Sequence, residues 1–72
     1  MKLEDILDKL GLELGMKVID TKPNPKIIRS KNYTYTLVKD RLDVVMFRNT
    51  DGWGFAPLYV LTKLGTRFKR IE

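Results

Sequence analysis

The hydrophobic period of this chain changes once, near residue 16, and that change restricts the fold more than any other sequence feature. Before it, apolar residues follow the i, i+3, i+4, i+7 spacing of one helical face, at Leu3, Ile6, Leu7 and Leu10. Gly11 follows directly and suits the left-handed position after a helix, where Leu12 can fold back on Leu7. We therefore predict a short helix over about residues 2–10, which must pack on something because it is too short to be stable alone.

From Met16 onward the period is two, and the apolar runs are short and separated by turn residues. Met16, Val18 and Asp20 should share one face of a first strand. Further strands are expected at "NYTYTLV" (32–38), "LDVVMFR" (42–48), "WGFA" (53–56) and "TRFKRI" (66–71). The loop "TKPNPK" (21–26) and the hairpin turn "NTDG" (49–52) separate them, and "LYVL" (58–61) is a helical turn or an extended corner.

These elements predict a single, mainly β (α+β) domain over residues 1–72. A short N-terminal helix and its connection should occupy residues 1–14, and a five-stranded barrel should occupy residues 15–72. A barrel is favoured over a sandwich because the strands are few and short. No apolar run approaches the roughly 18 residues that a membrane-spanning helix needs, and the acidic N-terminus is unlike a signal peptide. Together with the lack of cysteine, this predicts a cytoplasmic protein without a membrane partner.

The order of the elements resembles that of the SH3-like barrels. The longest loop falls between the first two strands, and "GFAPLYV" (54–60) resembles the SH3 ending in which a proline leads into Tyr-Val on a 3₁₀ turn. The stretches 31–52 and 66–71 are also similar in style to small SH3-like proteins of phages and mobile elements. Those proteins are often accessory binders of host or viral components, so the resemblance implies a five-stranded SH3-like barrel and a virus-encoded accessory or inhibitor protein.

The same comparison argues against a proline-peptide ligand. Peptide-binding SH3 domains have an Ala-Leu-Tyr-Asp-Tyr segment where this chain has "KVIDTKP" (17–23). They have a tryptophan pair where this chain has Leu42-Asp43-Val44-Val45, and an acidic loop where residues 22–32 contain only basic charges. The resemblance therefore extends to the fold and not to the ligand.

The residue types argue against catalysis. The chain has no cysteine and no histidine, which removes thiolate chemistry, the commonest general base and the commonest metal ligand. Of the aspartates, Asp40 and Asp51 fall in predicted turns, where they hydrogen-bond their own backbone. Asp20 and Asp43 are the remaining candidates for acid–base work, and nothing in the sequence pairs either with a nucleophile. We expect no catalytic residue, no metal and no cofactor.

The charge is unevenly distributed. The net charge is +5, but residues 1–15 hold two lysines against four acids, whereas residues 16–72 hold twelve basic residues against five acids. Such an excess permits contact with nucleic acid or with an acidic protein, and it also serves solubility.

Two binding hypotheses follow, and solubility alone stays open beside them. The first is a protein-binding module that uses exposed aromatic side chains with arginines nearby, at Trp53, Tyr59, Tyr33 or Tyr35, Arg48 and Arg41. The alternative is a basic, aromatic-lined face that binds nucleic acid, at Lys31, Lys39, Arg41, Arg67, Lys69 and Arg70. Against both, Phe68 and one tyrosine could be core residues.

The N-terminal helix and Trp53 each have two interpretations. The helix either plugs one end of the barrel or docks on a partner, which would allow a homo-oligomer. Trp53 either faces solvent with Tyr59 on one side of the Pro57 corner, or covers the barrel end against Leu3, Leu7 or Leu10.

Overall fold

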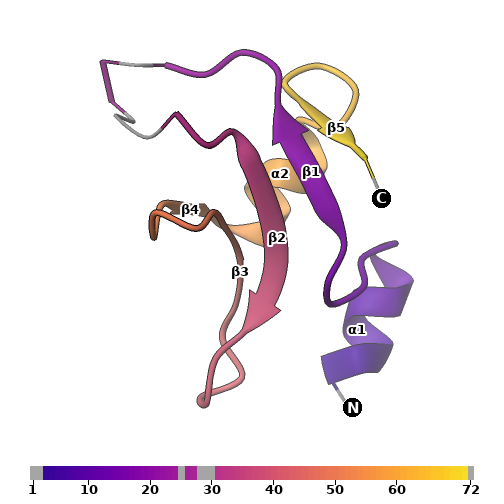
Figure 1. Ribbon diagram of the computed structural model, residues 1–72. Helices are drawn as coiled ribbons and strands as arrows, with labels where there is room; N and C mark the ends of the chain where they lie inside the picture. Colours follow the sequence, from indigo (N-terminus) through magenta and orange to yellow (C-terminus); the bar gives the residue numbers. More distant parts are fainter. Residues whose placement is uncertain (1–2, 25, 28–30, 72) are drawn as a thin grey trace.

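Five antiparallel strands form one sheet, and two short helices accompany it (Figure 1). The computed structural model describes residues 3–24, 26–27 and 31–71. Along the chain the elements are α1 (Leu3–Lys9), β1 (Lys17–Asp20), β2 (Thr34–Lys39), β3 (Val45–Arg48), β4 (Gly54–Phe55), α2 (Pro57–Thr62) and β5 (Phe68–Arg70). The prediction of a mainly β protein with five short strands is confirmed.

The sheet is open, so the prediction of a closed barrel is wrong. Its strand order is β4-β3-β2-β1-β5, and β4 and β5 stay at opposite edges. Two local features explain this. β4 has two residues and ends at Pro57, the start of α2. The outer side of β5 is already occupied, because Phe68 N–H donates to Lys63 O over 3.0 Å and Gly65 N–H donates to Phe68 O over 2.8 Å.

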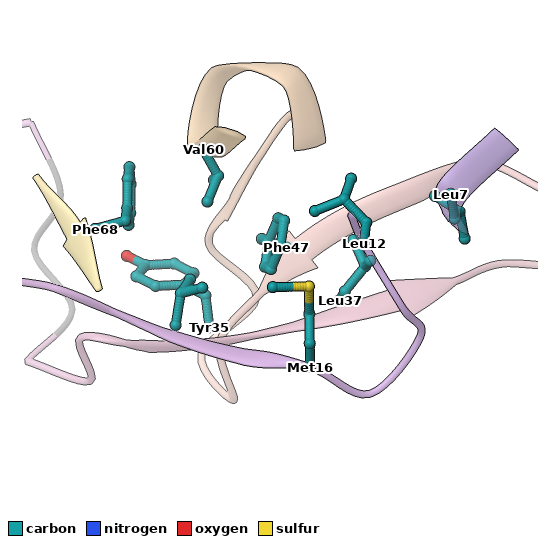
Figure 2. Packing of buried hydrophobic residues seen from close by; sticks show 9 residues of the cluster. Leu7, Leu12, Met16, Tyr35, Leu37, Phe47, Val60 and Phe68 are labelled. Carbon is teal, nitrogen blue, oxygen red and sulfur yellow. The ribbon is translucent and has the colours of Figure 1, made fainter. Parts of the chain in front are cut away.

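The core lies on one side of the sheet, where the alternation of each strand directs its apolar side chains. Figure 2 shows an aromatic end near β5, with Tyr35 and Phe68, and an aliphatic end toward α1, with Leu12 and Met16. The helix α2 lies over this inner face and buries Val60 against it. The buried apolar residues are Leu7, Leu12, Met16, Val18, Tyr35, Leu37, Phe47, Val60 and Phe68.

The end of α1 has the predicted form. Gly11 has φ 73°, its N–H donates to Asp8 O over 3.0 Å, and Leu12 N–H donates to Leu7 O over 2.8 Å. These two bonds make a Schellman motif, in which the leucines on either side of the turn pack together. The expected first residue of the helix, Lys2, lies outside the described residues. Ile6 and Leu10 are exposed, and among the α1 side chains from Asp5 onward Leu7 is the one that is buried in the core.

The third strand begins later than the sequence predicts. The carboxylate of Asp40 accepts the N–H groups of Leu42 at 2.8 Å and Val44 at 3.0 Å, and this extends the turn that follows β2. Asp43 takes φ 60° within the same turn. Leu42 and Val44 are therefore exposed, and the strand predicted from residue 42 begins only at Val45. Asp43 faces outward and pairs with Lys39 at 3.6 Å.

Candidate functional site

The side of the sheet opposite the core carries basic and hydroxyl side chains in register. Lys17 on β1 is opposite Thr36 on β2, which is opposite Arg48 on β3. Lys69 on β5 is likewise opposite Ile19 on β1. Because side chains alternate between faces, these residues point away from the buried positions that flank them in each strand. We call this set the outer face: Lys17, Ile19, Thr34, Thr36, Val38, Met46, Arg48 and Lys69.

A shallow groove follows β2 along the outer face. Its base is formed by Thr34, Thr36 and Val38, and Lys17 and Arg48 stand on the neighbouring strands on either side. We call it the β2 groove. Its full lining is Lys17, Asn32, Thr34, Thr36, Val38, Arg48, Asn49 and Thr50.

A hydrogen-bond network fixes one end of the β2 groove. Asn49 is buried, its side-chain amide donates to Asn32 O over 2.9 Å, and its Oδ1 accepts the N–H groups of Asp51 at 3.0 Å and Trp53 at 2.9 Å. The side-chain amide of Asn32 in turn donates to Thr50 Oγ1 over 2.6 Å. One buried amide thus holds the β3–β4 hairpin to the segment before β2. The sequence predicted the hairpin turn but gave no sign of this second attachment.

The charged side chains of the outer face are all basic. Among the described residues it carries Lys17, Arg48 and Lys69 and no carboxylate. Within the described residues, the hydrogen bonds of the Arg48 guanidinium are long, 3.5 Å to Gly52 O and 3.8 Å to Met46 Sδ, and its side chain is exposed. The described acids lie elsewhere: in α1 and its connection, in the turn after β2, in the β3–β4 loop and, for Asp20, inside the protein.

Arg67 is an internal residue and not part of a basic surface. Its Nε and Nη2 donate to the two carboxylate oxygens of Asp20 over 3.1 and 3.0 Å, and its Nη1 donates to Tyr59 Oη over 2.7 Å. The guanidinium carbon lies 5.1 Å from the ring centre of Phe55 and 5.2 Å from that of Phe68. The hydrogen bond to Asp20 raises the pKa of Arg67. The assignment of Arg67 to nucleic-acid binding is therefore corrected, because the inward-facing Asp20 needs this partner.

Tyr35 is also part of the core, which corrects its assignment as a surface contact. Its ring packs edge-on against Phe55 and Phe68, with centres 5.0 and 6.4 Å apart, and its side chain is fully buried. Its hydroxyl has no hydrogen-bond partner among the described residues. Burial, reinforced by the negative charge of Asp20, raises the pKa of Tyr35. Figure 2 shows the hydroxyl oxygen directed toward the Phe68 end of the core.

The other aromatic candidates are dispersed. Tyr59 is 39% exposed, stacks on Phe55 at 5.7 Å and holds Arg67. Tyr33 is partly buried just before β2. Trp53 is 38% exposed in the β3–β4 hairpin, which Figure 1 places well apart from α1. Trp53 therefore does not cover the end of the sheet against α1, and that alternative is excluded.

The remaining basic candidates fall on different surfaces. Lys39 pairs with Asp43, and Arg70 pairs with Glu13 at 2.9 Å. Arg41 is exposed in the turn after β2, and Lys31 is exposed beside the β2 groove. Of the six residues expected to bind nucleic acid, Lys69 alone belongs to the outer face. Lys17 was not predicted as a binding residue, and Arg48 was predicted to bind protein. The predicted alternation nevertheless puts Lys17 on the other face of its strand from Met16 and Val18.

Comparison of the chain with protein-family models, with curated proteins and with solved structures finds no match. In the part of the chain that the structure describes, no group of three or more acidic side chains is placed to hold a metal ion. Within the same residues, neither helix has the length and hydrophobicity to cross a membrane.

Proposed function

We propose that this protein is a non-enzymatic module that binds nucleic acid through its outer face. The observation that carries the proposal is the placement of Lys17, Arg48 and Lys69 on one face, where the described strands carry no acidic side chain. Lysine and arginine gain affinity for nucleic acid by neutralising phosphates and releasing counterions. The hydroxyl side chains between them supply further donors for phosphate oxygens.

The proposal includes an SH3-like relationship. The features that support it are the long loop between β1 and β2, the short hairpins that follow, and the proline-led helix α2 before β5. A role as an accessory protein of a phage or mobile element belongs to the same proposal, and a cytoplasmic location stays a prediction. No catalytic role is proposed for Asp20, because both of its carboxylate oxygens bind Arg67.

The experiment is a binding titration with charge variants. The triple variant Lys17→Gln/Arg48→Gln/Lys69→Gln should weaken binding of a fluorescent single-stranded oligonucleotide at least about tenfold at roughly 50 mM salt. It should also flatten the slope of log K against log salt by about 2, since each lost phosphate contact removes about 0.7 for single strands.

The matched control removes three exposed cations that lie off the outer face. The variant Lys9→Gln/Arg41→Gln/Lys63→Gln has the same net charge as the test variant, so it reports the effect of total charge alone. We expect a change of less than about threefold, since only contacting cations release phosphate counterions. Equal losses in the two variants would show that the outer face is not the binding site. Absence of binding by the wild type at this salt concentration would refute the proposal.

A second candidate is protein binding, and the exposure of Trp53 is the observation that favours it. Its ring makes no aromatic or cation–π contact within the described residues, and aromatic side chains exposed in this way often anchor protein interfaces. Trp53→Ala should release a protein partner captured from the native host after nuclease treatment. Capture that survives this substitution in the folded variant would remove Trp53 as the anchor.

A further inference from the structure

We infer that the β2 groove takes the sugar–phosphate backbone of a single strand and leaves the bases outside, so that binding does not depend on the bases. This inference rests on the proposed function and specifies which part of the nucleic acid the same site contacts. It follows from three properties of the groove: its width, the chemistry of its base, and the location of the aromatic rings.

The width suits one strand. Lys17 and Arg48 stand on strands that are separated only by β2, and neighbouring strands in a sheet lie about 4.8 Å apart. The walls of the groove therefore rise from backbones about 10 Å apart. One phosphodiester chain can run between them along β2 and meet a cation on each side. A duplex, whose minor and major grooves are about 6 and 12 Å wide, is itself too wide to enter this groove and can contact only its rims.

The base of the groove matches a backbone and not a nucleobase. At one end, Thr34 and Thr36 present hydroxyl groups, and the amide of Asn32 closes that end. Hydroxyl groups of this kind are common partners of phosphate oxygens and sugars. At the other end Val38 is aliphatic, and it offers contact to a sugar without a polar group that could read a base edge.

The rings of the sheet lie on the opposite side. Tyr35, Phe47 and Phe55 point into the core, and the outer-face positions of the described strands hold no aromatic residue. Proteins that hold single strands by their bases gain about 1–3 kcal/mol per base from aromatic stacking, and this groove has no ring to supply it. Cations and hydroxyl groups remain, and both recognise the backbone.

The test compares three fluorescent probes by anisotropy on the full chain at about 50 mM salt: an oligothymidylate of about 12 nucleotides, an abasic oligonucleotide of the same length, and the matching duplex. We expect the oligothymidylate and the abasic probe to bind within about threefold of each other, and the duplex to bind at least about tenfold more weakly. An abasic probe that binds at least about tenfold more weakly than oligothymidylate would overturn the inference while the proposed function stands. A duplex that binds as tightly as the single strand would overturn the single-strand part. If no probe binds, both this inference and the proposed function fail.

A single substitution in the groove provides an independent readout. Thr36→Val keeps the β-branched shape on β2 and replaces the hydroxyl group with a methyl group, so the strand should persist. It should weaken the oligothymidylate and the abasic probe by the same factor, about threefold to tenfold. The control Thr62→Val, on α2 and away from the groove, should leave both affinities unchanged. A loss confined to the oligothymidylate would mean that Thr36 reads a base, which contradicts the inference.

Discussion

Replacing Tyr35 with phenylalanine should stabilise the protein, because the hydroxyl of Tyr35 is buried without a hydrogen-bond partner among the described residues. Leaving such a group unpaired costs about 1–3 kcal/mol. Phenylalanine keeps the edge-on contacts with Phe55 and Phe68, which involve the ring alone. Removing one oxygen leaves only a small void, so we expect a net gain of about 1 kcal/mol. For a domain of this size that gain raises the melting temperature by about 4–8 °C.

Urea unfolding followed by the fluorescence of the single tryptophan measures this gain directly. The midpoint should rise and the slope should stay constant, since the surface exposed on unfolding barely changes. The control is Tyr59→Phe, which removes a hydroxyl that accepts a 2.7 Å hydrogen bond from Arg67 and should therefore lose about 0.5–1.5 kcal/mol. A loss of stability in Tyr35→Phe comparable to that of the control would refute the reasoning, because it would mean that the hydroxyl of Tyr35 is satisfied.

The same variant tests the pH dependence. Burial raises the pKa of Tyr35 in the folded protein above the value of about 10 that an unfolded chain has. The folded state therefore holds this proton more tightly, and the resulting stability is complete below about pH 10 and is lost as the pH rises through the folded pKa. The advantage of Tyr35→Phe over the wild type should widen above about pH 10. An advantage that stays constant across this range would show that Tyr35 does not titrate differently in the two states.

Four further substitutions test the Asp20–Arg67 pair and two glycines by urea unfolding. Asp20→Asn should cost about 3 kcal/mol because it leaves the guanidinium of Arg67 without its charge partner. Adding Arg67→Met should cost less than the two single losses together, and strict additivity would mean that the pair is not coupled. Gly11→Ala should cost about 1–2 kcal/mol from the positive φ alone. Gly54→Ala should cost about 1–3 kcal/mol for a different reason, since its new Cβ would lie 2.9 Å from Phe47 O, and a neutral result would show that β3 and β4 can separate.

The local parts of the fold could be predicted because their causes lie within a few residues. The Schellman motif needs only Gly11 and the leucines around it, and the period of two correctly assigned Val18 and Asp20 to the inner face. The late start of β3 was missed because Leu42 and Val44 look like strand residues. The carboxylate of Asp40, which holds their N–H groups in a turn, outweighs that preference.

The site was harder to predict because it depends on pairing between distant segments. Asp20 and Arg67 are 47 residues apart, and only the register of β1 with β5 brings them together. In the sequence, Arg67 stands among other basic residues and looks like part of a surface cluster. Lys17 and Arg48 look unrelated until β2 aligns them across the sheet. Tyrosine residues are common both in cores and in binding surfaces, and Tyr35, in the clearest predicted strand, is a core residue.

The open sheet has two edge strands, and neither favours pairing with a strand of another molecule. β4 offers two residues before Pro57 turns the chain into α2, and β5 is three residues long, with Phe68 already bonded to the preceding turn and two cations beyond it. Short, charged or proline-terminated edges are how β proteins avoid pairing with their neighbours. Many copies can therefore reach high local concentrations without their sheets pairing edge to edge into fibrils.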